Sequence, residues 1–214
     1  MVQRFTDSDI QKLGKQFKTN LINSISGFKS LQLVGTLSEN GEPNLAVSNS
    51  IFHLGANPPL LGMVMRPEGN ENSTLKNIIA NEFYTLNNVT ESFYRQAHQT
   101  SARYLRGESE FEKCNLGESY VNDFMAPFVA QATIKIGLSL RQLLPVELNH
   151  TTIVIGEIQL IEIDDSLLAA DGFIDLTIAG SLTVAGLDSY YSTKPLARLT
   201  YAKPGTEPEE VHNI

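Results

Sequence analysis

The chain has 214 residues, 42% of them hydrophobic, and a formal net charge of −8, so it can bury a core and is not a disordered chain. The excess of acidic residues argues against nucleic acid as a partner. The sequence has no run of 18 apolar residues, so it predicts no membrane-spanning helix. The single cysteine, Cys114, excludes a disulfide framework and fits a reducing cytoplasm, where we expect the protein to act.

Residues 1–27 are expected to form a helical extension, with Asp7 and Ser8 capping a helix that starts at about Asp9. From residue 31 the apolar pattern changes to a period of two, which is typical of a strand. The turn at 39–42 contains Asn-Gly, the strongest short-range hairpin signal. Residues 44–52 are predicted to form the return strand and residues 60–65 a third strand, so the three would pair as a meander.

The rest of the chain predicts alternating short helices and strands. The expected elements are a helix at 74–80, a strand at 83–86, a helix from 90 to about 106, a strand at 134–141, a long strand at 151–163 and an extended tail at 203–214. Full crossover helices between strands, the mark of a parallel sheet, are missing. We therefore predict a mainly β, antiparallel fold with inserted helices, in one domain over residues 1–214.

Several common catalytic signatures do not occur. The sequence has no G-x-G-x-x-G after a strand, no Walker phosphate loop, no H-E-x-x-H and no G-x-S-x-G. We predict no metal site. An enzyme that has neither its own nucleophile nor a metal can use an organic cofactor, which then carries the chemistry.

The first informative segment ends a predicted strand with Ser48, Asn49 and Ser50. These residues offer hydroxyls, an amide and exposed backbone groups to a ligand. Because Ser and Asn commonly finish strands, an ordinary strand end is the alternative interpretation.

The second segment combines Arg66, after a predicted strand, with the hydroxyl-rich helix start Ser73-Thr74 and with Asn77 in its first turn. Free N–H groups at a helix start favour an anion, and arginine offers a forked cation to a phosphate. A plain helix cap with a surface arginine is the alternative. A third segment places His150 just before the long strand, as a contact to a bound ring or as a solvated loop residue.

The order of these segments resembles the flavin reductase-like family, whose members have the FMN-binding split-barrel fold. The similarity covers roughly residues 28–165, with a weaker echo at Tyr190-Tyr191 and at 198–201. It rests on the following stretches: Leu33-Val34-Gly35-Thr36, Asn40-Gly41, Asn44, Ser48 to Phe52, Pro58-Pro59, Met65-Arg66-Pro67, Ser73 to Ile78, Phe83 to Asn87, Ala126-Pro127 and Ile155-Gly156-Glu157-Ile158.

Two features depart from the family pattern. The family often shows Gly-Asp-His before the long strand, whereas this chain has Leu148-Asn149-His150, so the carboxylate next to the histidine is missing. The segment from Tyr94 to Asp123 is also longer than in compact members, which suggests a lid or altered substrate access.

The resemblance implies a small antiparallel Greek-key barrel that pairs into a homodimer, with FMN near the interface. It implies that Ser48, Asn49 and Ser50 contact the flavin ring or ribityl chain. It also implies that Arg66, Ser73 and Thr74 hold the phosphate, and that Asn77 supports that loop. His150 would act as the catalytic residue by orienting the nicotinamide or the flavin edge.

The function implied is an NAD(P)H-dependent flavin reductase, in which reduced nicotinamide passes a hydride to flavin N5. FMN is favoured over FAD. One alternative is a non-catalytic FMN-binding electron-transfer protein, and another is a barrel that binds FAD, haem or no ligand.

Overall fold

The computed structural model describes residues 1–67, 74–105 and 107–211. Its centre is a seven-stranded antiparallel sheet with the order β3-β2-β6-β9-β10-β5-β4. These strands are β2 (Gln32–Leu37), β3 (Pro43–Ser48), β4 (Ile51–Ala56), β5 (Pro59–Met65), β6 (Phe83–Asn88), β9 (Ile134–Val146) and β10 (Thr151–Ile163). The mainly β, antiparallel fold predicted from the sequence is confirmed.

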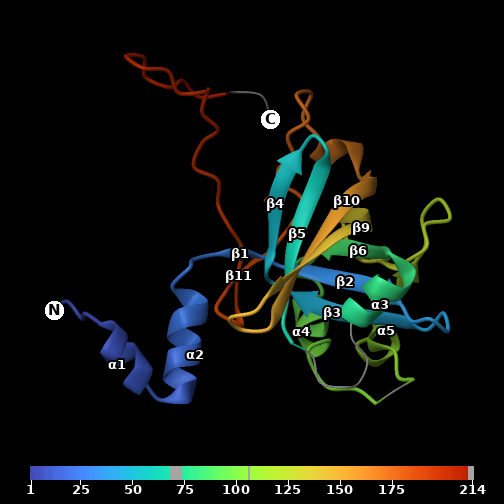
Figure 1. The fold of residues 1–214 in the computed structure, drawn as a ribbon. Coiled ribbons are helices and arrows are strands. Elements are labelled where there is room, and N and C mark those ends of the chain that lie inside the picture. Colours follow the sequence, from blue (N-terminus) through green and yellow to red (C-terminus); the bar gives the residue numbers. More distant parts are fainter. Residues whose placement is uncertain (68–73, 106, 212–214) are drawn as a thin grey trace.

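The sheet folds into two halves that cross at a steep angle (Figure 1). Strands β2, β3 and β6 form one half and β4 and β5 the other, and the long strands β9 and β10 run between them. The register of β9 and β10 shifts at two places, between Ile155 and Gly156 and between Ile158 and Leu160. Such bulges bend a strand, so they help one pair of strands to serve both halves.

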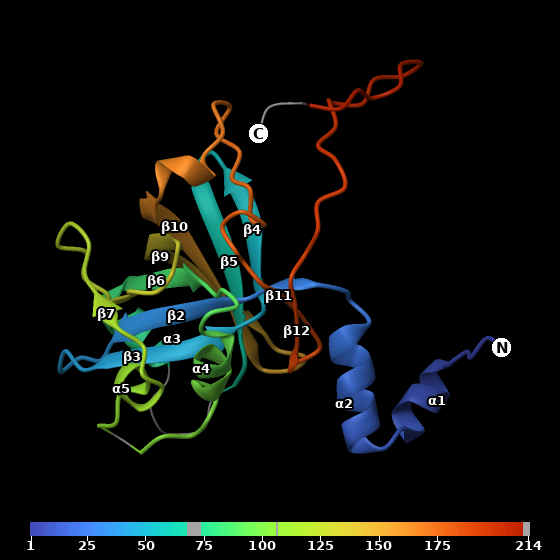
Figure 2. The same ribbon diagram turned by 180° about the vertical axis from the view of Figure 1, so that it is seen from behind.

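Smaller elements surround the sheet. They are the helices α1 (Asp7–Lys12), α2 (Lys15–Ser24), α3 (Thr74–Asn81), α4 (Tyr94–Gln99) and α5 (Glu110–Lys113), the turn η1 (Asp165–Leu167), and the strands β1 (Lys29–Ser30), β7 (Glu118–Ser119), β8 (Phe128–Val129), β11 (Thr183–Ala185) and β12 (Ser189–Tyr191). Strands β1, β11 and β12 form a second sheet, and β7 pairs with β8. Seen from behind, β11 and β12 lie between the barrel and α2 (Figure 2).

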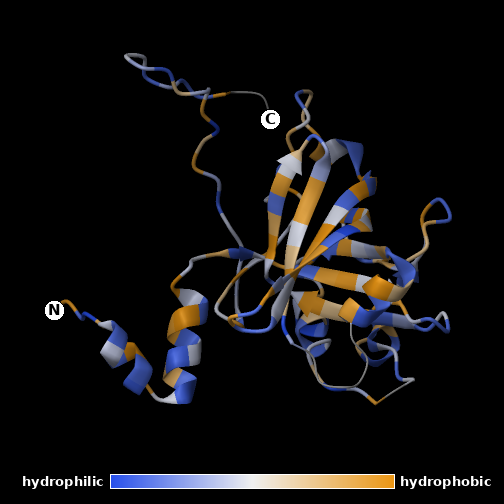
Figure 3. Ribbon diagram, viewed as in Figure 1, coloured by the Kyte–Doolittle hydropathy of each residue, from blue (hydrophilic) through white to orange (hydrophobic). Residues whose placement is uncertain are grey.

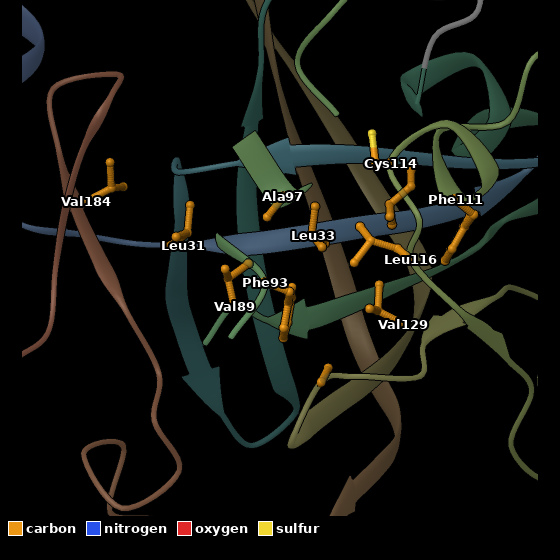
Figure 4. Packing of buried hydrophobic residues seen from close by; sticks show 12 residues of the cluster. Leu31, Leu33, Val89, Phe93, Ala97, Phe111, Cys114, Leu116, Val129 and Val184 are labelled. Carbon is orange, nitrogen blue, oxygen red and sulfur yellow. The ribbon is translucent and has the colours of Figure 1, made fainter. Parts of the chain in front are cut away.

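Two apolar clusters lie on opposite faces of the first half of the sheet. Leu33 points into a cluster with Phe93 and Phe111, whereas its neighbour Val34 joins a cluster with Tyr84 inside the barrel. Figure 4 shows the first cluster, in which residues from α4, α5 and the following loop cover β2. Because successive strand residues face opposite ways, β2 is buried on both faces.

Three sequence-based expectations about these elements are wrong. Thr6 caps α1 through a capping box, so the helix starts before Asp9, and a break at Leu13-Gly14 separates it from α2. The helix expected from 90 to about 106 is only α4, six residues long. The return strand expected at 44–52 is two strands that pair at opposite edges of the sheet, so the predicted meander does not form. The extended tail expected at 203–214 stays a prediction; in its described part, isolated bridges join Leu199 to Glu210 and Lys203 to Thr206.

No helix in residues 1–67, 74–105 and 107–211 is long and apolar enough to cross a membrane.

Candidate functional site

The predicted Ser-Asn-Ser segment lies at the corner where the chain leaves one half of the sheet and enters the other. Strand β3 ends at Ser48 and β4 begins at Ile51. Within the corner, the Ser50 hydroxyl donates to Asn49 Oδ1 at 3.2 Å, and the Ser50 carbonyl accepts from the Val64 amide at 2.9 Å. Polar residues suit such a corner, since the backbone groups there leave one ladder before they join the next.

A cavity of about 500 Å³ opens at this corner. Its lining includes five of the predicted site residues, Ser48, Asn49, Ser50, Arg66 and Thr74. Ser73 lies outside the described residues. The fold therefore brings together segments that are separated by up to 26 residues in the sequence, whereas Asn77 and His150 are not part of the lining.

Arg66 brings a positive charge to the cavity lining, and Lys29 lies near it. Arg66 follows β5, and its Nη2 donates to Asn23 Oδ1 at the end of α2 at 3.4 Å. Lys29 in β1 donates from Nζ to the Asn23 carbonyl at 3.1 Å. Partial burial lowers the pKa of Lys29, and the nearby charge of Arg66 lowers it further. Arg66 lines the cavity and Lys29 lies outside its lining, so together they give this side of the cavity a positive potential that favours an anion.

Asn77 supports the helix start from behind the cavity. Thr36 Oγ1 accepts from Asn77 Nδ2 at 3.1 Å and from Asn44 Nδ2 at 3.2 Å, and Asn44 Nδ2 also lies 3.3 Å from Thr74 Oγ1. Asn77 and Thr74 are both buried, so this network fixes the first turn of α3 on the sheet. Asn77 therefore lies where it can support the start of α3, and its role in flavin binding stays a prediction.

His150 lies in the exposed turn between β9 and β10, with a positive φ of 59°. The preceding Asn149 accepts from the Thr151 amide and hydroxyl, at 3.2 and 2.8 Å, so it shapes the turn and does not contact the histidine ring through these bonds. Met65 pairs with Thr152, so the turn lies next to the strand end that Arg66 follows. Within one subunit His150 does not reach the cavity lining, and its catalytic role stays a prediction.

Sequence reasoning missed several lining residues. His98 and Ser101 come from α4 and the residues after it, and Val184, Asp188 and Tyr190 come from β11, β12 and their turn. His98 Nδ1 lies 2.5 Å from the Tyr190 hydroxyl. The weaker similarity to the family at Tyr190-Tyr191 was the sequence feature that pointed to this part of the lining. No local pattern indicates His98, because its partner is 92 residues away.

The donor set of the cavity fits a phosphorylated planar ring. Apolar side chains of Leu31, Val34, Val64 and Met65 form much of its wall, and the corner at 48–50 supplies polar groups. Mostly apolar clefts with a few placed polar groups are typical of cofactor sites, and Arg66 beside the start of α3 suits a phosphate. Across the described part of the chain, no group of three or more His, Cys, Asp or Glu residues is arranged to hold a metal ion.

Comparison with known sequences gives one family. The model of the family described as "Flavin reductase like domain" matches residues 29–177. A search of curated proteins found no match.

Several solved structures share the fold. A candidate flavin reductase with a split barrel domain from Shewanella frigidimarina NCIMB 400 is 44% identical, with a TM-score of 0.90 over 94% of this chain and 100% of the other. Nitrilotriacetate monooxygenase component B from Bacillus cereus is 19% identical, with a TM-score of 0.80 over 93% and 99% of the two chains. The 2-nitrobenzoate 2-nitroreductase of Pseudomonas fluorescens is 21% identical, with a TM-score of 0.80 over 96% and 99%. The chain therefore belongs to the flavin reductase-like family and has its split-barrel fold.

Proposed function

We propose that the protein is an NAD(P)H-dependent flavin reductase that binds FMN in the cavity at the β3–β4 corner. The observation that carries the proposal is the cavity itself, where polar corner groups, an apolar wall and a cationic end meet. Family membership supports flavin-dependent oxidoreductase chemistry in general. Among structures of the same fold are an NADH:FAD oxidoreductase of Streptomyces globisporus and an FMN-binding protein of Thermus thermophilus, so both flavins and the nicotinamide donor are reasonable on this fold.

The residues of this chain bind and orient in the proposed reaction. Arg66 and Thr74 hold the phosphate, with Lys29 adding positive potential and Asn77 keeping the start of α3 in place. Ser48 and Ser50 present hydroxyls to the polar edge of the ring. A bound flavin would supply the chemistry as the hydride acceptor at N5.

The direct test is oxidation of NADH and NADPH by the purified protein, with and without added FMN, followed by absorbance of the reduced nicotinamide. We expect FMN to raise the rate. Flavin binding without consumption of either nicotinamide under air would contradict the reductase assignment.

A non-catalytic FMN-binding electron carrier is the second candidate. The finding that favours it is that structures of the same fold include a flavoredoxin of Desulfovibrio vulgaris and an FMN-binding protein of Thermus thermophilus. The same assay separates the two candidates, because a carrier binds flavin and does not turn over nicotinamide on its own.

We also propose a homodimer. Helix α2 and its C-cap Ile25 carry apolar side chains at positions 17, 21 and 25, which share one face, and Phe17 and Ile25 are 55% and 73% exposed. Figure 3 shows hydrophobic segments on this helix, which stands away from the barrel. A second copy of the chain would cover this face. Sedimentation at several protein concentrations tests the dimer, and a monomer at micromolar concentration would contradict it.

Arg66→Ala tests the phosphate end of the cavity. Loss of a charged hydrogen bond to the phosphate should weaken FMN binding by about 1.5–3 kcal/mol, roughly tenfold to a hundredfold, and leave riboflavin binding nearly unchanged. Flavin fluorescence titration measures both. Arg141→Ala is the control, because Arg141 pairs with Glu157 on the surface and does not line the cavity. An equal loss for FMN and riboflavin would remove Arg66 from this role.

A further inference from the structure

Part of the cavity wall comes from a hairpin that lies after the family-matched region, which ends at residue 177. Strand β11 pairs with β1 through Val184 and Lys29, and the Thr183 hydroxyl donates to the Lys29 carbonyl at 2.7 Å. Val184 is 1% exposed and belongs to the first apolar cluster. The hairpin is therefore a fixed part of the body.

Asn49 attaches the turn of this hairpin to the sheet corner. Its Nδ2 donates to the Gly186 carbonyl at 3.0 Å, across 137 residues of sequence. The amide is thus engaged in joining two walls of the cavity. Gly186 has a positive φ of 66°, a conformation that suits glycine at the tight turn.

The second strand of the hairpin, β12, carries Tyr190, whose ring contacts two other aromatic rings. Its hydroxyl lies 2.5 Å from His98 Nδ1, and the two rings meet edge to face with centroids 5.7 Å apart. The ring of Tyr94 also packs on Tyr190 in a tilted arrangement, with centroids 5.5 Å apart. Burial raises the pKa of Tyr190, and the nearby Asp188 carboxylate raises it further, so the phenol is neutral at physiological pH.

Among the described residues that line the cavity, His98 and Tyr190 carry the only aromatic rings. Arg66 lines the same cavity as Tyr190, so a flavin whose phosphate lies at Arg66 has its ring within reach of the lining that includes Tyr190. Aromatic rings in contact prefer offset or edge-to-face packing, and such contacts are stronger when the ring is already held in place.

We propose that Tyr190 is the aromatic wall against which the isoalloxazine ring packs, and that His98 is the positioning residue that holds Tyr190 there. The inference rests on the proposed function, because it assumes that the cavity binds flavin. It adds a ring-binding element from the C-terminal hairpin and α4 to the phosphate-binding element at Arg66.

The experiment titrates full-length protein with riboflavin and with FMN, and follows flavin fluorescence and the visible absorption band. Tyr190→Ala should lower the affinity for both flavins by the same factor, about tenfold, because both contain the isoalloxazine ring. Tyr190→Phe keeps the aromatic ring and should therefore lose less flavin affinity than Tyr190→Ala. Tyr191→Ala is the matched control, since the neighbouring tyrosine packs on Phe28 and does not line the cavity.

Two variants test the positioning role of His98. His98→Leu removes the hydrogen-bonding partner of the Tyr190 hydroxyl and should reproduce part of the loss seen in Tyr190→Ala. His98→Asn places an amide group where Nδ1 lies and should restore binding. A structural role alone would not predict rescue by asparagine, because asparagine restores the hydrogen bond and not the volume of the imidazole.

Wild-type affinity in Tyr190→Ala, or a loss for FMN that riboflavin does not share, would overturn the inference. Equal losses for His98→Leu and His98→Asn would remove the positioning role. If the wild-type protein binds neither flavin, the proposed function fails together with the inference, whereas normal flavin binding in the wild type and in Tyr190→Ala overturns the inference alone.

Discussion

The barrel and its two extensions differ in how they are held. In the body around the sheet, side chains such as Leu33, Phe111 and Phe128 are at most 1% exposed, whereas no residue of α1 or α2 is buried. The segment after β12 is similar, with Leu196 and Tyr201 at 100% and 90% exposure. Both extensions project from the same side of the barrel (Figure 1).

This difference shows that local signals can form a helix that tertiary packing does not yet stabilise. Thr6 and Asp9 complete a capping box, with the Asp9 carboxylate accepting from the Thr6 amide at 2.9 Å. Helices as short as α1 and α2 are marginal by themselves in water. Within one subunit α2 is tied to the barrel near Asn23, through Arg66 and Lys29, so the proposed second subunit would supply the missing apolar contacts.

The largest expected contrast comes from the same substitution in the two regions. Phe111→Ala removes a ring from the first apolar cluster and should lower the free energy of unfolding by about 3–5 kcal/mol. Phe17→Ala should change it by about 0.5 kcal/mol or less at low protein concentration, because Phe17 is 55% exposed. Urea unfolding measures both. Equal losses would contradict the division into barrel and extension.

A glycine pair gives a smaller contrast. A Cβ at Gly156 would lie 2.1 Å from the Tyr84 hydroxyl inside the barrel, whereas a Cβ at Gly14, between α1 and α2, meets nothing within 4 Å. Gly156→Ala should therefore cost about 1–3 kcal/mol of stability, and Gly14→Ala a few tenths. Thermal unfolding compares the two variants. An unchanged midpoint for Gly156→Ala would show that Tyr84 can move aside.

The smallest effect is expected at Glu110, which joins α5 to β3. Its Oε2 accepts from the Leu45 amide at 3.0 Å, and burial raises its pKa above the usual 4.5, partly opposed by this hydrogen bond. In the pH window above 4.5 the folded state therefore holds more proton than the unfolded state, and this group makes stability fall as pH rises. Below 4.5 the group is protonated in both states.

Glu110→Gln keeps an acceptor for Leu45 and removes the buried charge. We expect the variant to be slightly more stable than the wild type at about pH 7 and to lose that advantage at about pH 4. Urea midpoints at both pH values measure it. A constant difference across this range would show that the carboxylate is not the cause.

Much of the sheet could be predicted because its signals are local. The alternating pattern at 31–38 and the Asn40-Gly41 turn correspond to the β2–β3 hairpin, and the predicted strand 151–163 matches β10. The corner at 48–50 was identified as a polar strand end, but not as the break between two strands. No local sequence pattern indicates that break, because the residues on both sides have the pattern of a strand and differ only in the strands with which they pair.

The binding residues could be predicted only in part, because contacts between distant segments leave no local pattern. Ser48, Asn49, Ser50, Arg66 and Thr74 share the cavity, as the order of segments suggested. The engagement of Asn49 with Gly186 depends on a contact across 137 residues, which no pattern in either segment announces.

By itself the sequence determined the antiparallel strands, the hairpin turn, the start of α3 and the polar residues at strand ends, since each depends on neighbours within a few positions. Only the tertiary structure decided that β3 and β4 lie at opposite edges of the sheet, that His98 meets Tyr190, and that His150 stays outside the cavity. These outcomes depend on which distant surfaces bury each other, and burial is a property of the packed whole.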